Sequence, residues 1–125
     1  MRKFSLCLLA ALALSGCNSK SEQFCGTFNG TLPAASNPGI ETTINFDKDH
    51  TFNTKLVYID EPDGVFYESG TYQRKGSLIT ARPADNDPQY YQIENGQIRR
   101  LDSEKKPITG SLADFYILKQ TRSCE

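Results

Sequence analysis

The sequence predicts an all-β protein, built as a small antiparallel β-barrel of about eight short strands in a single domain. From residue 24 onward, apolar and polar residues alternate, as they do in strands with one buried face. Gly, Pro, Asn and Asp cluster between these stretches at spacings that suit neighbouring strands. Closing such a meander into a barrel removes exposed sheet edges. A small two-sheet sandwich is the alternative.

The clearest strand is the stretch 40–46, in which Ile40, Thr42, Ile44 and Phe46 share one face. A turn ending at His50 follows, and alternation resumes in a second strand, so that residues 40–59 are predicted to form a hairpin. Further strands are expected at 24–32, 65–74, 77–82, 89–94, 97–101 and 113–120. Asn95-Gly96 is the strongest signal for a tight hairpin turn.

Residues 1–16 have the features of an export signal: two basic residues, an apolar run and small residues at its end. Leu14-Ser15-Gly16-Cys17 resembles the bacterial lipobox, in which the chain is cleaved before the cysteine and the thiol is lipidated. This predicts a signal peptide at 1–16, a lipidated tether at 17–23 and a β-barrel domain at 24–125. The alternative is an ordinary secretory signal with Cys17 in a disulfide.

Two cysteines remain once Cys7 leaves with the signal and Cys17 carries lipid. In an oxidising compartment, Cys25 and Cys124 are expected to pair as a disulfide that joins the start of the domain to its end. A redox-active pair is the alternative, although the two residues lack a Cys-x-x-Cys arrangement.

The charge balance argues against nucleic-acid binding. Loss of Arg2 and Lys3 with the signal reduces the basic residues from 14 to 12 against 15 acidic residues, a net charge of −3. The sequence has no basic stripe to meet phosphates.

The residues for catalysis or metal binding are also sparse. The single histidine, His50, lies in a predicted turn, which argues against most Ser-His-Asp and Cys-His enzymes. We interpret it as a turn residue with positive φ; a metal site with Asp47 and Asp49 is the alternative, and it would be weak. No catalytic residue, metal ligand or cofactor is assigned.

Three aromatic pairs lie in predicted strands: Phe66-Tyr67, Tyr90-Tyr91 and Phe115-Tyr116. Because neighbours in a strand point to opposite faces, one ring of each pair is expected inside the barrel and the other outside. Outer tyrosines could anchor a protein partner or merely cover neighbouring strands.

The stretches "GTFNGTLP" (26–33), "GIETTINFDKDHTF" (39–52) and "YYQIENGQIRRLDSEKKPI" (90–108), with "ESGTYQR" between them, resemble the N-terminal domain of NlpE-like envelope lipoproteins. The resemblance implies a lipocalin-like barrel on an outer-membrane lipoprotein. Longer members are linked to copper tolerance, surface adhesion and activation of an envelope-stress sensor kinase. Asn18 after the lipidated cysteine also favours the outer membrane, with the domain facing the periplasm.

This chain departs from the family at a Cys-x-x-Cys motif, whose positions are occupied by Ala34 and Asn37. The resemblance therefore implies no thiol chemistry here. We expect a non-enzymatic lipoprotein that attaches to the membrane by its lipid and acts through contacts with an envelope protein, such as a sensor kinase. The alternatives are a small-molecule or metal-binding carrier barrel and, on a partial Ser69-Gly70-Thr71-Tyr72 match, an inhibitor of lysozyme.

Overall fold

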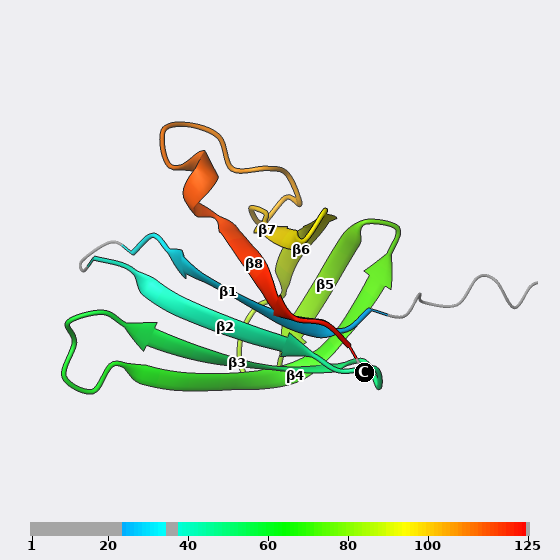
Figure 1. Cartoon of the computed structure of the whole chain (residues 1–125), viewed down its shortest axis with the longest axis horizontal. Helices are drawn as coiled ribbons and strands as arrows, with labels where there is room; N and C mark the ends of the chain where they lie inside the picture. Colours follow the sequence, from blue (N-terminus) through cyan, green and yellow to red (C-terminus); the bar gives the residue numbers. More distant parts are fainter. Residues whose placement is uncertain (1–23, 35–37, 125) are drawn as a thin grey trace, which may run out of the picture.

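The computed structural model describes residues 24–34 and 38–124, which form one closed antiparallel barrel (Figure 1). Its strands are β1 (Gly26–Leu32), β2 (Ile40–Phe46), β3 (Thr51–Tyr58), β4 (Val65–Lys75), β5 (Leu78–Pro83), β6 (Gln89–Glu94), β7 (Gln97–Arg100) and β8 (Ile117–Arg122). Each strand pairs with the next, and β8 returns to β1. The all-β barrel prediction is therefore confirmed, and the sandwich alternative is wrong.

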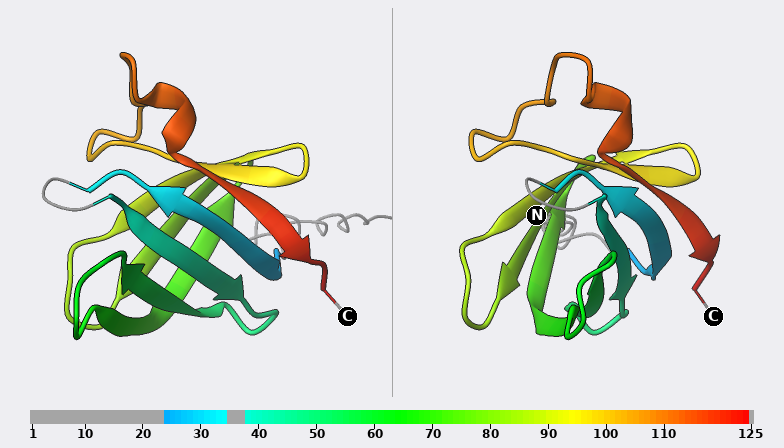
Figure 2. Two further views of the ribbon diagram at one scale, coloured as in Figure 1. Left: turned by 60° about the vertical axis from the view of Figure 1, so that its left-hand side comes forward. Right: turned by 90° about the vertical axis from the view of Figure 1, so that its left-hand side faces the viewer.

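The two ends of the barrel are built differently, as the two views of Figure 2 also show. At the closed end, which lies on the right in Figure 1, short turns join β2 to β3, β4 to β5, and β6 to β7. At the open end, longer connections join β1 to β2, β3 to β4, β5 to β6, and β7 to β8. The described chain also begins and ends at the closed end, where β1 starts and β8 finishes.

Local sequence explains the turns of the closed end. His50 has a φ of 70°, as the sequence predicts for this turn, and its N–H donates to the Asp47 carbonyl. Asn95-Gly96 joins β6 to β7, with Gly96 at a φ of 72°, so this hairpin prediction is also confirmed. Glycine adopts such a backbone without a steric penalty.

Aromatic rings fill the closed end of the barrel. The Phe46 ring lies at its centre, with centroid distances of 5.3 Å to Phe24, 4.9 Å to Tyr72 and 6.2 Å to Phe52. The first and second of these contacts are edge-to-face, an arrangement worth about 0.5–1.5 kcal/mol per pair beyond area burial. The buried apolar residues of the whole core are Phe28, Leu32, Ile44, Phe46, Phe52, Tyr72, Ile79, Ala81, Tyr91, Ile98, Leu101 and Leu118.

The Tyr72 hydroxyl lies between the segment that precedes β1 and the β2–β3 turn. It lies within hydrogen-bonding reach of the carbonyl oxygens of Phe24 and Asp47, and it can donate to one of them at a time. Burial raises the pKa of Tyr72 to about 12, and the negative charges of Asp47 and Asp49 add to the rise. The phenol therefore stays protonated and able to donate.

The strand predicted at 113–120 is wrong in its first half. Ala113–Phe115 form the 3-10 helix η3, in which the N–H of Phe115 donates to the Leu112 carbonyl, and β8 starts at Ile117. The pairing of β7 with β8 stops at Arg99 and Ile117, and among the described residues only one further hydrogen bond follows, from the Arg100 N–H to the Tyr116 carbonyl. Without a neighbouring strand, local hydrogen bonds determine the backbone here.

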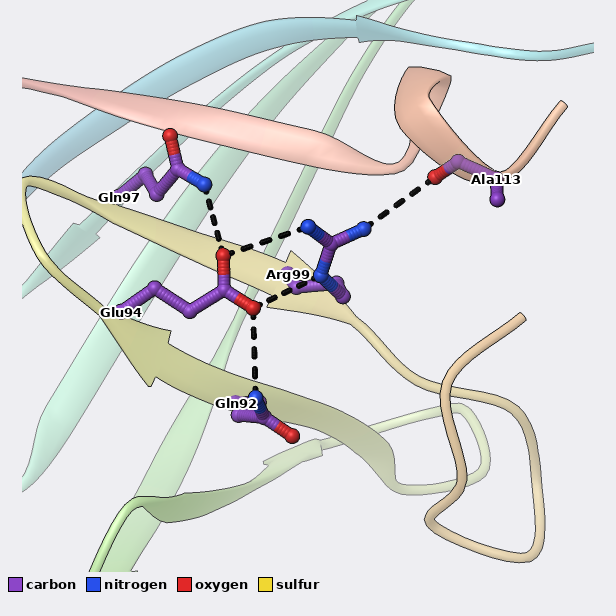
Figure 3. A network of polar contacts seen from close by, with 5 residues as sticks. All are labelled: Gln92, Glu94, Gln97, Arg99 and Ala113. Carbon is purple, nitrogen blue, oxygen red and sulfur yellow. Dashed lines mark hydrogen bonds and ion pairs between the residues drawn. The ribbon is translucent and has the colours of Figure 1, made fainter. Parts of the chain in front are cut away.

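A polar network attaches η3 to the β6–β7 hairpin (Figure 3). Arg99 donates from Nε to Glu94 Oε2 at 2.8 Å, and from Nη1 to the Ala113 carbonyl at 3.4 Å. Gln97 and Gln92 also donate to the Glu94 carboxylate. Hydrogen bonds from Arg99 and, to a lesser extent, from Gln97 hold the pKa of Glu94 below its usual value, so the carboxylate stays charged. The charged carboxylate positions Arg99, which in turn contacts η3 in the β7–β8 connection.

Candidate binding site at the open end

Strand β4 extends beyond its neighbour at the open end. It has 11 residues, whereas β5 has 6, and their pairing stops at Gly70 and Pro83. One further hydrogen bond runs from the Ala84 N–H to the Ser69 carbonyl. We call Val65–Glu68 the β4 overhang; within the described chain, β3 is its only strand neighbour.

Local sequence explains where the overhang starts. A Cβ at Gly70 would lie 2.0 Å from the Arg82 carbonyl oxygen, so the close approach of β4 and β5 requires glycine there. The last hydrogen bond between the two strands, from the Ala84 N–H to the Ser69 carbonyl, lies one residue beyond this contact. The overhang therefore begins just beyond this close contact and the last hydrogen bond.

The overhang exposes large apolar side chains. Val65 is 48% exposed, Phe66 52% and Tyr67 73%. Phe66 lies on the inward face of β4 and packs edge-to-face on Tyr58, with ring centroids 5.4 Å apart. Large exposed apolar side chains gathered at one strand end, here on both of its faces, are a candidate interaction surface.

A cleft of about 720 Å³ lies against the overhang. Its lining combines apolar and aromatic residues with polar ones: Leu56, Tyr58, Glu61, Pro62, Asp63, Gly64, Phe66, Tyr67, Glu68 and Asn86. The cleft is open to solvent along the β3–β4 connection. It has the size of a ligand cleft but lacks the enclosure of one.

A second, smaller cavity of about 190 Å³ lies deeper, inside the barrel; we call it the inner cavity. Its walls are Leu32, Ile40, Thr42, Thr54, Leu56, Tyr58, Glu68, Gln89, Tyr91 and Arg100. Leu56, Tyr58 and Glu68 line both the inner cavity and the cleft. The two spaces are therefore adjacent at the mouth of the barrel.

Polar groups are concentrated in the inner cavity. The Tyr91 hydroxyl donates to Gln89 Oε1 at 3.2 Å, and the Arg100 guanidinium lies 5.6 Å from the Tyr91 ring centroid. Burial raises the pKa of Tyr91, and the positive charge of Arg100 opposes that rise. Glu68 accepts hydrogen bonds from the Asn86 and Gln89 amides.

The structure describes some of the predicted site residues and not others. Cys17 and Asn37 lie outside the described residues, whereas Ala34 lies half-buried just after β1. The structure joins Cys25 to Cys124 by a disulfide at the closed end, with Cα atoms 5.3 Å apart. This crosslink joins the start of the described domain to its end, with a sequence separation of 99 residues.

His50 lies beside the core at the closed end. Its ring stacks on Tyr72 with centroids 5.4 Å apart. Within residues 24–34 and 38–124, no group of three His, Cys, Asp or Glu side chains is placed to hold a metal ion.

The three aromatic pairs differ in their outcome. Tyr91 is buried, and its neighbour Tyr90 is half-buried, as the alternation predicts. For Phe66 and Tyr67 the prediction is wrong, because the inward-facing Phe66 ring lines the solvent-open cleft and stays half-exposed. Phe115 and Tyr116 lie in and after η3, not in a strand, with Tyr116 packed on the core and Phe115 exposed.

Sequence reasoning missed the inner cavity. One signal was available in the sequence, namely polar residues at positions of a strand that the apolar–polar alternation assigns to the inward face. These residues are Thr42, Thr54, Glu68 and Arg100. They gather in one place only because closure of the barrel brings β2, β3, β4 and β7 around the same space.

Comparison with known proteins gives a consistent picture. The sequence profile of the NlpE N-terminal domain matches residues 28–111. Lipoprotein NlpE of Escherichia coli strain K12 is 24% identical over 119 residues, covering 83% of this chain and 50% of that protein. The 17 kDa lipoprotein of Treponema pallidum strain Nichols is 27% identical, covering 78% of this chain and 70% of that protein. The chain thus spans about half the length of E. coli NlpE.

Solved structures agree. A Shewanella oneidensis protein described as a lipoprotein has a TM-score of 0.68 and 36% identity, covering 77% of this chain and 87% of that one. The Cpx pathway activator NlpE from E. coli has a TM-score of 0.63 and 27% identity, covering 69% of this chain and 46% of that one. In the described part of our chain, no helix is long and apolar enough to cross a membrane. The family resemblance is confirmed: the chain belongs to the NlpE N-terminal domain family.

Proposed function

We propose that this protein is a non-enzymatic, lipid-anchored lipoprotein of the outer membrane that faces the periplasm and acts through protein contacts. Its role would be to contribute to an envelope stress response or to surface sensing. The observation that carries the proposal is the β4 overhang, where exposed apolar side chains and an unpaired strand edge occur together.

The overhang fits an extended segment of a partner protein. A strand edge without a neighbour offers backbone N–H and C=O groups for pairing. An added strand would bond to the backbone of the overhang, while Phe66 and Tyr67 would supply apolar contacts on its two faces. A sensor-kinase-type envelope protein with an extended segment is the partner we propose.

The position of Phe24, just before β1, supports an orientation of the barrel relative to the membrane. Phe24 packs on Phe28 and Phe46 at the closed end. Lipidation of Cys17 would put the membrane anchor on that side, because a tether of seven residues reaches at most about 25 Å. The open end would then face away from the membrane and toward periplasmic partners.

The comparisons support the proposed role in part. The E. coli relative with a solved structure is described as an activator of the Cpx pathway, and this chain matches 46% of that structure. Copper tolerance, which the resemblance links to the family, receives no separate support from this chain. Ala34 and Asn37 carry no thiol, and the described residues form no metal-binding group.

A lysozyme-inhibitor role is not favoured. The Ser69-Gly70-Thr71-Tyr72 segment lies within β4, and the Tyr72 ring is 1% exposed in the core. That tyrosine is therefore not presented to a partner.

Site-specific crosslinking in intact envelopes tests the proposal. A photoreactive phenylalanine analogue replaces Tyr67 in the lipidated full chain, and Gln73 provides the control because it is exposed on the outward face of the same strand. We expect one defined membrane-protein adduct from position 67, none from position 73, and loss of the adduct on Phe66→Asp. Equal labelling from both positions, or no adduct from 67, would contradict a contact surface on the overhang.

A further inference from the structure

The inner cavity contains the buried Thr54 hydroxyl, for which the described residues provide no hydrogen-bond partner, and it is lined by the Arg100 guanidinium, which forms no ion pair within them. We propose that it binds a small apolar monocarboxylate, with the carboxylate held by Arg100 and Thr54 and the apolar body directed toward the cleft. This goes beyond the proposed function, because it needs neither lipidation nor a protein partner.

Arg100 supplies the charge for this site. It is half-buried, lines the cavity and contacts the Tyr91 ring, yet among the described residues it forms no ion pair. The planar donors of a guanidinium suit a carboxylate, and Glu68, the acidic residue that lines the same cavity, is itself bonded to Asn86 and Gln89. Its neighbour Arg99 faces the other side of β7 and pairs with Glu94.

Thr54 supplies a second, independent donor. It is 3% exposed, and its hydroxyl oxygen has no hydrogen-bond partner among residues 24–34 and 38–124. The hydroxyl of Thr42, on the adjacent strand, instead donates to the Ile40 carbonyl at 3.1 Å. A buried hydroxyl without a partner is unusual, because leaving it unpaired costs free energy. A ligand oxygen in the cavity would satisfy it.

Glu68 restricts the charge of the ligand. Its two oxygens accept from Asn86 at 2.9 Å and from Gln89 at 3.1 Å, so the carboxylate is held on the wall between the cavity and the cleft. A fixed negative charge there repels any anionic group, so the ligand carboxylate has to lie on the Arg100 side of the cavity, and a second anionic group is disfavoured. The site therefore suits one carboxylate followed by an uncharged body.

The dimensions and walls suit a short apolar body. A cavity of about 150 Å³ holds benzene, so the inner cavity of about 190 Å³ admits a group slightly larger. Leu32, Ile40, Leu56 and Tyr58 give it apolar walls. A longer ligand would continue past Leu56 and Tyr58 into the cleft, toward Phe66.

The test uses the full chain with Cys17→Ala, which carries no acyl chain on Cys17 to compete for the cavity. Octanoate labelled with ¹³C at the carboxyl carbon is titrated by calorimetry and NMR, with octylamine and octanol as probes of the same length. We expect saturable one-to-one binding of octanoate, no saturable binding of octylamine, and octanol binding weaker by about tenfold or more. The amide signals of Thr54, Tyr91 and Arg100 should shift on binding.

Variants separate the site from general hydrophobic binding. Arg100→Met should weaken octanoate binding by about tenfold or more, Thr54→Val by about threefold or more, and Arg99→Met by less than about twofold. Backbone NMR spectra check that each variant is folded, and the nearly isosteric Thr54→Val serves if Arg100→Met is not. Absence of saturable octanoate binding, equal binding of octanol, or equal losses at Arg99 and Arg100 would each overturn the proposal.

Discussion

The closed and open ends of this barrel use similar residues for different purposes. At the closed end, Phe46 is 1% exposed and lies among the rings of Phe24, Phe28, Phe52 and Tyr72. At the open end, Phe66 is 52% exposed and packs on the Tyr58 ring. Both phenylalanines lie on inward faces of strands, so strand alternation alone does not explain the difference. It arises because β4 continues beyond the strand that would have completed the wall.

This difference indicates a division between stability and function. The closed end holds the aromatic cluster, the short turns and the disulfide, so the free energy of folding should be concentrated there. In the described part of the chain, the open end has exposed apolar side chains, a strand edge without a pairing strand and a hydroxyl without a hydrogen-bond partner, all of which cost stability in a solitary protein. Such features persist where binding uses them.

The largest contrast should come from removing one ring at each end. Phe46→Ala is expected to lower the free energy of unfolding by about 3–5 kcal/mol, because it leaves a cavity within a packed cluster. Phe66→Ala should cost less than about 1 kcal/mol, because the ring is half-exposed already. Urea denaturation of both variants measures the difference, and similar losses would contradict the division between the ends.

The Cys25–Cys124 crosslink should give the next largest effect. Replacing both cysteines by serine is expected to lower the free energy of unfolding by about 2–5 kcal/mol, since the unfolded chain regains the freedom of a loop of 99 residues. The measurement is urea denaturation of this variant and of the parent chain, with reduced parent chain as a control. A loss below about 1 kcal/mol would show that the closed end does not depend on the crosslink.

Tyr72→Phe tests the polar anchor of the closed end. It should cost about 1 kcal/mol at neutral pH through the lost hydrogen bond. The pKa of Tyr72 rises from 10 to about 12 on folding, so the folded state holds this proton more tightly. Its contribution to stability is therefore complete below pH 10 and is lost as the pH rises to about 12. The free energy of unfolding, measured by denaturation from pH 8 upward, should fall less steeply with pH in Tyr72→Phe than in the parent chain. Identical slopes would refute this account.

The smallest expected effect has the opposite sign. Thr54→Val should raise the free energy of unfolding by up to about 1 kcal/mol, because it removes a buried hydroxyl without a partner and keeps its shape. Thr42→Val provides the matched control, since that hydroxyl has a backbone acceptor. Thermal unfolding without ligand distinguishes them. A destabilised Thr54→Val would mean that the hydroxyl is satisfied within the protein.

Local patterns predicted the strands better than the site. Alternation in residues 40–46 and the turns at His50 and Asn95-Gly96 depend on neighbouring residues, and the structure confirms all three. The overhang and the inner cavity depend on where distant strands start and stop. No single strand indicates where the β4–β5 pairing stops, or that barrel closure brings Arg100 and Thr54 into one space. The 3-10 helix at Ala113–Phe115 was missed for the same reason, because the partner strand ends earlier.

Hydrogen exchange of the intact chain tests the division between the two ends most directly. We predict that the amides of Phe46 and Tyr72 exchange only through global unfolding, so their protection should match the free energy from denaturation. The Phe66 amide, which points to β3, should exchange by local opening with protection at least about 100-fold lower, and the Val65 and Tyr67 amides, which point to the edge that no described strand pairs with, should be protected still less. Uniform protection along β4, from Val65 to Tyr72, would contradict the claim that stability is concentrated at the closed end.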